Sequence, residues 1–427
     1  MSMLVELRAA SRRPVAGVVD QHVEDAAALR ATRSVLVRAP HVKLHHLARL
    51  DERPAAALDG TALAGTLGQR RCMQALDPVS PGPLFAAASI AIRAGDDAAL
   101  DKLAAIAEAA PDAAGPLVSA FGWASPAWLR GTVKALLESP SAVRREVGLG
   151  ACAAHGVDPG SALALALDVD GDAASAHALW AACRLGRREL LPACLRLMDD
   201  TRCVHRVQAA RAALLMGERE RAPALLQRLA QAAGPSQAAA LRLFLHVAPP
   251  EQVHATLSTL AREGTSKRLL VAGVGIGGDP QFVPWLIEQM GDPALARLAG
   301  ESFSRITGVD LSLLDLDRDA AAADGPDDDP ANDDVAIDED DSLPWPDPDK
   351  LSHWWRTHGK RLAPGVRHFM GAPPSPAHCR AVLGSGFQRQ RIAAAEQLCL
   401  QQPGSPLFNT AAPAWRQQRE LGVGSTT

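Results

Sequence analysis

The sequence contains no tyrosine, and aromatic residues of all kinds make up only 4% of its 427 residues. Strands favour aromatic and β-branched side chains, whereas the abundant alanine, leucine and arginine are among the best helix formers. The composition therefore argues against a β-rich protein. We expect an all-α chain, and its length indicates either several domains or an extended repeat array.

Long apolar runs and a disulfide framework are also missing. No run approaches the roughly 18 apolar residues of a membrane-spanning helix, and the N-terminal MSMLVELRAASRRP has no apolar stretch long enough for a secretory signal. The seven cysteines are odd in number and widely spaced. We predict a cytoplasmic protein without membrane contact, whose cysteines are reduced and mostly buried.

Charge is distributed unevenly along the chain, although the net charge is only −4. Residues 315–341 carry thirteen acids and one base, whereas residues 342–427 carry ten bases and four acids. A strongly acidic stretch cannot bury enough apolar surface to offset its ordering entropy. We therefore expect an N-terminal helical cap at 1–90, an array at 91–314, an acidic disordered linker at 315–341 and a basic C-terminal helical module at 342–427.

A glycine-centred frame recurs about every 30 residues in the middle of the chain. The anchors are Gly156, Gly186, Gly217, Ala248 and Gly278, separated by 30, 31, 31 and 30 residues. Two weaker copies lie upstream, at Gly95 and Gly122. Each unit has the pattern of a first helix, a turn and a second helix. A helix pair this short cannot bury its own apolar face, so neighbouring pairs must stack into an α-solenoid.

The unit length and the proline in the second helix resemble HEAT repeats of the short bacterial type. This resemblance implies a right-handed solenoid of about six or seven HEAT-like helix pairs. The C-terminal helical module would follow it after the acidic linker.

Gly273, Gly275 and Gly278 also match the G-x-G-x-x-G spacing of a dinucleotide-binding turn. That turn requires a strand before the motif and a helix that starts at its last glycine. Asp279 and Pro280 instead suit the start of a new helix. We interpret Gly278 as a turn between two helices and expect no cofactor.

Catalytic and metal-binding motifs are not supported by the spacing. Aspartate triplets at 168–172 and 315–319 begin like calcium loops, but alanine stands at the sixth position, where glycine is needed. The histidine and cysteine groups at 41–46 and 194–205 lack a convincing fourth zinc ligand. No Walker loop, HExxH motif or nucleophile–His–Asp order is present. We predict a non-enzymatic protein without a bound metal.

The C-terminal module holds the residues that we consider for partner binding. They are Trp345, Trp354, Trp355, Arg389 and Arg391. Two interpretations of the tryptophans remain open: they pack on the solenoid end from a helix at about 349–358, or they form an interface hot spot. The two arginines either dock on the acidic linker or bind an acidic partner.

A nucleic-acid-binding solenoid is the alternative function. The basic residues near predicted helix starts are Arg144, Arg145, Arg187, Arg188, Lys267 and Arg268. If they lined one surface, they would contact phosphates. However, residues 1–314 carry 33 bases against 31 acids, and the acidic linker would compete for any basic groove. We therefore do not expect a nucleic-acid partner.

Several segments together resemble a known family. They are LHHLARLDERPAAALDG, GDPQFVPWLIEQMGDPALARLAGESFSRITGVDL, LPWPDPDKLSHWW and GFQRQRIAAAEQLCLQQPGSPLFNTAAPAWRQQ. The chain is similar to a bacterial family of HEAT-repeat-like proteins encoded near type VI secretion spike-tip and effector genes. The resemblance implies an adaptor or chaperone for that apparatus and brings no catalytic residues. We expect it to bind a protein, an effector or spike-tip protein, along the concave surface of the solenoid.

Overall fold

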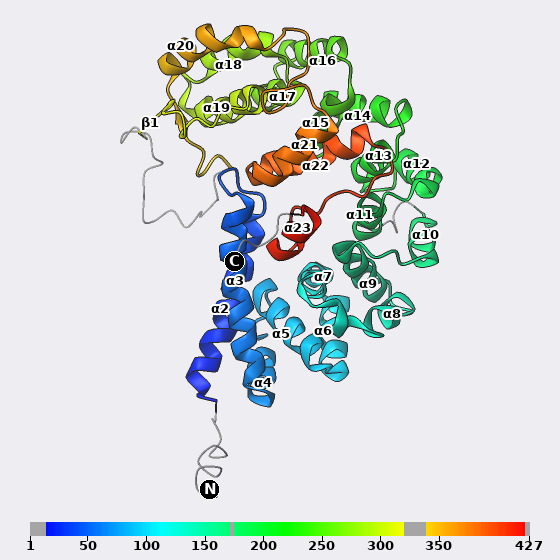
Figure 1. Cartoon of the computed structure of the whole chain (residues 1–427). Coiled ribbons are helices and arrows are strands. Elements are labelled where there is room, and N and C mark those ends of the chain that lie inside the picture. The colour runs from blue at the N-terminus through cyan, green and yellow to red at the C-terminus, as the bar shows by residue number, and fades with distance from the viewer. Residues whose placement is uncertain (1–13, 171–174, 320–338, 423–427) are drawn as a thin grey trace, which may run out of the picture. The chain divides into compact units, whose positions relative to one another are not determined.

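The computed structural model describes residues 14–170, 175–319 and 339–422, and these are almost entirely helical (Figure 1). Within these ranges the only sheet is a pair of two-residue strands, β1 (Asp317–Arg318) and β2 (Trp345–Pro346), which are antiparallel. The prediction of an all-α, solenoid-like fold is confirmed.

The chain divides into two compact units that are not consecutive in sequence. Unit 1 comprises residues 1–37, 45–163 and 411–427, and unit 2 comprises residues 38–44 and 164–410. This division differs from the four consecutive segments expected from the sequence. The reason is that residues 411–422 pack with the N-terminal helices, whereas residues 38–44 pack with residues 164–410. The C-terminal module is divided, with its last helix in unit 1 and its other helices in unit 2.

Unit 1 is built from helix pairs whose first helices pack on one another. Its helices are α2 (Ala16–Leu36), α3 (Leu44–Leu63), α4 (Thr66–Gln74), α5 (Pro81–Ala94), α6 (Asp97–Ala109), α7 (Ala114–Trp123), α8 (Thr132–Leu137), α9 (Ala142–His155) and α23 (Ala414–Glu420). Helix α5 packs on α2 and α7, and α7 packs on α9. These contacts place the first helices of successive pairs side by side.

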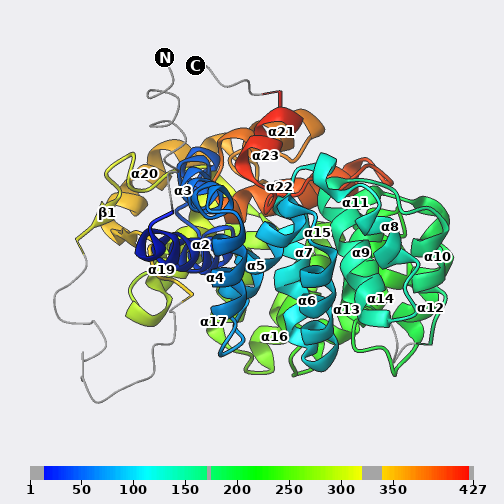
Figure 2. The same cartoon turned by 90° about the horizontal axis from the view of Figure 1, so that it is seen from below.

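Unit 2 continues this pairwise pattern. Its helices are α11 (Ala176–Leu185), α12 (Leu191–Asp199), α13 (Arg206–Leu215), α14 (Arg221–Gln231), α15 (Gln237–Val247), α16 (Pro250–Arg262), α17 (Lys267–Gly277), α18 (Val283–Gln289), α19 (Pro293–Thr307), α20 (Pro348–His358), α21 (Pro376–Ser385) and α22 (Gln388–Gln401). Helix α10 (Ser161–Leu167) spans the boundary between the units. The first helices α11, α13, α15, α17 and α19 pack one against the next, an order that can be followed in Figure 1. Figure 2 gives a second view of the same elements.

The glycine frame marks the ends of first helices. Gly186 and Gly278 end α11 and α17 in the left-handed conformation that glycine adopts most easily. Gly308 ends α19 in the same way, 30 residues after Gly278, and so extends the frame by one further anchor. The upstream copy at Gly122 is wrong, because α7 continues through it and is capped at Ala124.

The G-x-G-x-x-G match is a turn between two helices, as predicted. Gly273 and Gly275 lie inside α17. A Cβ on Gly275 would lie 2.7 Å from Cβ of Ser302, so this glycine allows α17 and α19 to approach closely. Asp279 then caps the following turn by accepting a hydrogen bond from the amide of Gln281.

All seven cysteines are free and buried, in agreement with the sequence. Across the ranges that the structure describes, no helix is both long and apolar enough to cross a membrane.

Candidate functional site

In unit 2 the C-terminal segment covers the ends of the first helices. The last carbonyls of a helix have no intrahelical donor and need partners from elsewhere. The amide of His368 donates to the carbonyl of Gly278 (2.7 Å), and the amide of Met370 donates to that of Arg305 (2.7 Å). Three further amides donate to helix-end carbonyls in this way: Gly371 to Ile306 (3.0 Å), Gly404 to Leu215 (3.0 Å) and Leu407 to Cys183 (3.4 Å). The ends of α11, α13, α17 and α19 therefore receive donors from the C-terminal segment.

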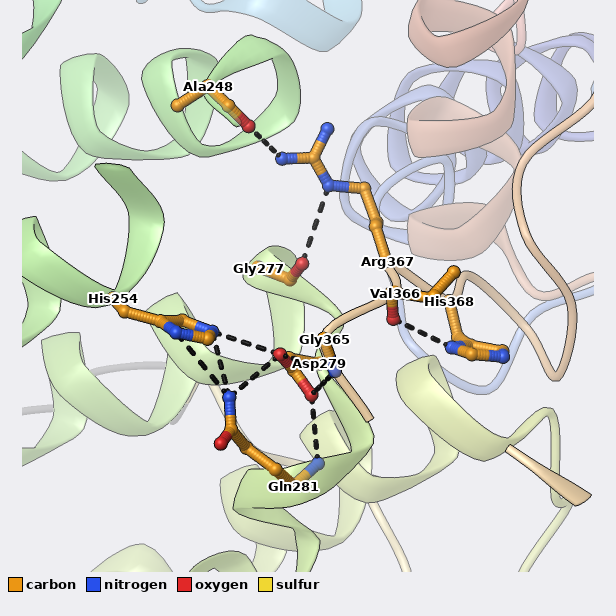
Figure 3. A network of polar contacts seen from close by, with 9 residues as sticks. All are labelled: Ala248, His254, Gly277, Asp279, Gln281, Gly365, Val366, Arg367 and His368. Atoms are coloured by element: carbon orange, nitrogen blue, oxygen red, sulfur yellow. Dashed lines mark hydrogen bonds and ion pairs between the residues drawn. The ribbon is translucent and has the colours of Figure 1, made fainter. Parts of the chain in front are cut away.

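Arg367 supplies donors to the end of α15, and Figure 3 shows its bonds to the carbonyls of Ala248 and of Gly277 in α17. Its guanidinium donates from Nη1 to the carbonyl of His246 (2.7 Å) and from Nη2 to those of Leu245 (2.7 Å) and Ala248 (2.6 Å). A cation at a helix C-terminus is stabilised by the helix dipole. Burial lowers the pKa of Arg367. One arginine thus binds three carbonyls that have no partner within the helix.

Asp279 holds the same loop through its carboxylate. Its oxygens accept from the amide of Gly365 (3.0 and 3.1 Å), and Oδ2 lies 2.9 Å from Nε2 of His254 (Figure 3). The side chain is buried, at 4% exposed. The sequence predicted only its capping role. Its contact with Gly365 fixes the start of the loop that carries Arg367.

A buried charge cluster joins α22 to the array. Glu396 on α22 is 2% exposed and accepts from Nε of Arg211 on α13 (2.8 Å) and from Nη1 of Arg242 on α15. Burial opposes ionisation of Glu396, but Arg242 and Arg211 outweigh it and hold the pKa of the carboxyl well below its usual range. The carboxylate is therefore ionised and paired twice. No sequence pattern indicated this contact, because its members are far apart in the chain.

His246 lies at the edge of this cluster. Its Nε2 is 3.0 Å from Nη2 of Arg305, and its Nδ1 is 3.6 Å from Oε2 of Glu396. Burial, followed by the charge of Arg305, lowers the pKa of His246 well below its ordinary value. The imidazole is therefore neutral, and Nε2 accepts from Arg305.

A cleft of about 660 Å³ in unit 2 contains two of the candidate partner-binding residues, Trp345 and Arg389. It also includes Lys43, Phe387 and Leu313. The Lys43 ammonium lies 4.5 Å from the centre of the Phe387 ring, and Leu313 is 78% exposed. Aromatic and arginine side chains are enriched in protein-binding patches, and Trp345, Phe387 and Arg389 all line this cleft. We call this site the unit 2 cleft.

The three candidate tryptophans do not form one patch. Only Trp345 lines the unit 2 cleft, where the guanidinium of Arg297 lies 5.0 Å from its ring centre. Trp354 packs edge to face on Phe303 of α19, with ring centres 5.6 Å apart. The Trp355 ring lies against Gly359, whose added Cβ would be 2.8 Å from it. Packing on the array therefore applies to Trp354.

The two candidate arginines differ in their exposure to solvent. Arg391 is fully buried and donates to the carbonyl of Leu383 (2.7 Å), so the expectation that it meets a partner is corrected. Arg389 is partly exposed and pairs with Glu301 (2.8 Å). It also donates to the carbonyl of Glu339 (2.5 Å), in the acidic segment. Residues two apart lie on opposite faces of a helix, so α22 buries Arg391 and leaves Arg389 in the cleft.

The acidic linker is bound to unit 2 at both ends. Residues 320–338, where disorder was predicted, lie outside the described residues. Arg318 pairs with Trp345 across the two strands. Asp340 is 4% exposed and accepts two bonds from Arg268, at 2.7 and 2.9 Å. The ends at 315–319 and 339–341 are therefore ordered, in contrast to the expectation for the whole segment.

Several of the arginines considered for phosphate binding already pair with carboxylates of the chain. The pairs are Arg144 with Asp101 (2.6 Å), Arg187 with Glu189 (2.6 Å) and Arg268 with Asp340 (2.7 Å). These contacts reduce the positive charge that each arginine offers to a phosphate.

Metal ligands are not gathered in the part of the chain that the structure describes. No group of three or more His, Cys, Asp or Glu side chains is placed there to hold an ion. Cys194 and Cys203 are buried. The two aspartate triplets considered for calcium continue into residues 171–174 and 320–326, which lie outside the described ranges.

A comparison of the chain with protein-family models, with curated proteins and with solved structures finds no match. The residues of the unit 2 cleft are therefore the basis for a functional proposal.

Proposed function

We propose that the protein is a non-enzymatic, cytoplasmic adaptor that binds another protein at the unit 2 cleft. The observation that carries this proposal is the exposure of Leu313, at 78%, in a cleft shared with Trp345 and Phe387. Tryptophan and arginine side chains are enriched in interface hot spots, and Trp345 and Arg389 both line this depression.

The position of the proposed site differs from the one expected from the sequence. A partner along the first-helix ends of unit 2 would have to displace the C-terminal segment, including the three bonds from Arg367. Those bonds satisfy carbonyls that would otherwise lack donors. A partner that binds at the unit 2 cleft leaves them intact.

The charged residues of the cleft indicate which kind of partner fits it. Lys43 and Arg389 supply positive charge, and Glu301, Asp310 and Asp317 supply negative charge. Lys43 lies 3.6 Å from Asp310, and Arg389 lies 2.8 Å from Glu301. A cleft that holds both paired charges and apolar side chains favours a partner segment that carries apolar side chains and charges of both signs. We therefore propose an amphipathic protein segment as the ligand.

The resemblance to HEAT-like proteins of type VI secretion neighbourhoods supports the choice of partner. On that basis we propose that the partner is an effector or a spike-tip protein of this apparatus. The role would be that of an adaptor or chaperone that holds its partner before loading.

The experiment compares two charge insertions at exposed leucines of unit 2. Leu313→Lys changes the cleft, and Leu165→Lys changes a leucine that is 69% exposed outside it. Tagged variants are used to capture proteins from the native cytoplasm, and the proteins retained are identified by mass spectrometry. We expect the wild type and Leu165→Lys to retain an effector or spike-tip protein and Leu313→Lys to lose it. Equal retention by all three would exclude the cleft as the binding site.

A further inference from the structure

Unit 1 contains a second cleft, of about 580 Å³, that the proposed function does not use. Tryptophans from three elements line it: Trp123 at the end of α7, Trp128 in the 3₁₀ helix η2 (Pro126–Leu129) and Trp415 in α23. The rings of Trp123 and Trp415 meet edge to face, with centres 4.7 Å apart. Trp128 and Trp415 are 44% and 39% exposed. The volume suits a small ligand, and the exposed indoles offer it stacking surfaces.

The wall formed by α23 is anchored within unit 1. The amide of Ala414 donates to Oδ2 of Asp51 (2.7 Å), a carboxylate that is 1% exposed. Arg33 bonds the same carboxylate through Nε (2.6 Å) and donates to the carbonyl of Ala412 (2.9 Å). These buried bonds hold Trp415 in place, so the cleft exists before any ligand binds.

One arginine at this cleft, Arg419, makes no ion pair among the residues that the structure describes. Arg419 follows Trp415 by four residues, which places both on one face of α23. It is exposed, and within residues 14–170, 175–319 and 339–422 its guanidinium makes no ion pair. Arg93, in contrast, pairs with Asp59 and lies 5.3 Å from the centre of the Trp128 ring. Arg419 therefore offers its planar fork to an anionic group of a ligand.

The lining also contains a buried hydroxyl. Ser89 on α5 is 8% exposed, and among the residues that the structure describes its Oγ has no hydrogen-bond partner. Buried polar atoms are almost always hydrogen-bonded, so a hydroxyl of this kind that lines a cleft takes its partner, a ligand or a water, from the cleft. This observation is independent of the aromatic walls and of Arg419.

We propose that the unit 1 cleft binds an acylated aromatic carboxylate. The ring would stack on Trp128 and Trp415, the carboxylate would bind Arg419, and an amide or carbonyl group would bond the hydroxyl of Ser89. An N-acylated aromatic amino acid and the C-terminal aromatic residue of a polypeptide present this same chemistry. The inference does not rest on the proposed function, because it concerns other residues in the other unit.

The test is a calorimetric titration of the full chain with three probes. They are N-acetylphenylalanine, its amide and the peptide acetyl-Ala-Ala-Ala-Phe. We expect the acid to bind with a dissociation constant on the order of 1 mM, given its size. The amide, which has no carboxylate, should bind at least about tenfold more weakly. Tighter binding of the peptide would identify a polypeptide C-terminus as the ligand, and tighter binding of the small acid would identify a free metabolite.

Substitutions at Arg419 and Ser89 test the two proposed polar contacts with the ligand. Arg419→Gln should weaken binding of the acid about tenfold, by loss of a charge-assisted bond, and Arg356→Gln, at an exposed arginine of α20, should leave it unchanged. Ser89→Ala should weaken binding while the melting temperature of the free protein stays the same or rises, because an unsatisfied buried hydroxyl is removed. Equal binding of the acid and the amide, binding of no probe, or full affinity in Arg419→Gln would overturn the proposal.

Discussion

The amide of His368 donates a 2.7 Å hydrogen bond to the carbonyl of Gly278. At the same point a Cβ on Gly278 would lie only 2.3 Å from the carbonyl oxygen of His368. The glycine therefore has two functions. It allows the left-handed end of α17, with φ of +76°, and it leaves room for the C-terminal segment.

Substitution of Gly278 separates these two functions. Gly264 is the matched control, because it also has a positive φ, of +72°, but a Cβ there would meet nothing within 4 Å. Gly264→Ala should cost about 1 kcal/mol of unfolding free energy, the usual cost of a left-handed residue. Gly278→Ala should cost about 2 kcal/mol or more, because the backbone of His368 must also shift. Urea unfolding of both variants measures the difference, and equal losses would contradict a tightly docked C-terminal segment.

Two arginines on α22 should differ strongly in their contribution to stability. Arg391→Met leaves the carbonyl of Leu383 buried without its donor, so we expect a loss of about 2–3 kcal/mol. Arg389→Met removes the partly exposed pair with Glu301, and we expect a loss below about 1 kcal/mol. Chemical denaturation followed by circular dichroism gives both values. A larger loss at Arg389 would mean that the assignment of the buried arginine is wrong.

The carboxylate of Glu396 should stabilise the contact between α22 and the array. Glu396→Gln leaves Arg211 and Arg242 without their anion, and we expect a loss on the order of 2 kcal/mol at pH 7. This value is below that of a fully buried pair because the Arg242 side chain is 36% exposed. Glu301→Gln, which alters a more exposed pair, should cost less than about 1 kcal/mol. Because folding lowers the pKa of Glu396, the contribution is complete above pH ~4.5 and should disappear as the pH falls below that value.

His246 should make stability depend on pH in a higher range. Its pKa is lowered in the folded protein, so the unfolded chain binds the proton more strongly. Stability should therefore fall as the pH drops below ~6.5, by at most about 1.4 kcal/mol per pH unit. His246→Gln retains an acceptor for Arg305 and should show a flatter profile between pH 7 and pH 5. Identical slopes for the variant and the wild type would show that His246 is not buried in the neutral form.

Features set by local backbone geometry could be predicted from the sequence. The left-handed glycines at 186 and 278 and the start of a new element at Asp279 follow from the residues themselves. The anchor at Gly308 obeys the same period and could have been found by extending it. At Gly122 a glycine inside a helix imitated the pattern, because glycine is also used where helices pack closely.

The contacts of the C-terminal module could not be predicted in this way. Arg389 and Arg391 carry the same charge and lie two residues apart, yet α22 buries only one of them. Glu396 meets arginines from two other helices, which only the folded array brings together. Likewise, Trp345 reaches the unit 2 cleft because it pairs with Arg318 across the acidic segment. Such contacts depend on tertiary packing and leave no periodic signal.

The affinity of the protein for a purified effector or spike-tip partner is the most direct test of the adaptor proposal. It should be measured for the wild type, Leu313→Lys and Leu165→Lys at the same ionic strength. We predict that Leu313→Lys, which replaces an exposed apolar side chain of the unit 2 cleft by a charged one, raises the dissociation constant at least about tenfold, while Leu165→Lys leaves it unchanged. Unchanged affinity in Leu313→Lys, or equal loss in both variants, would contradict partner binding at this cleft.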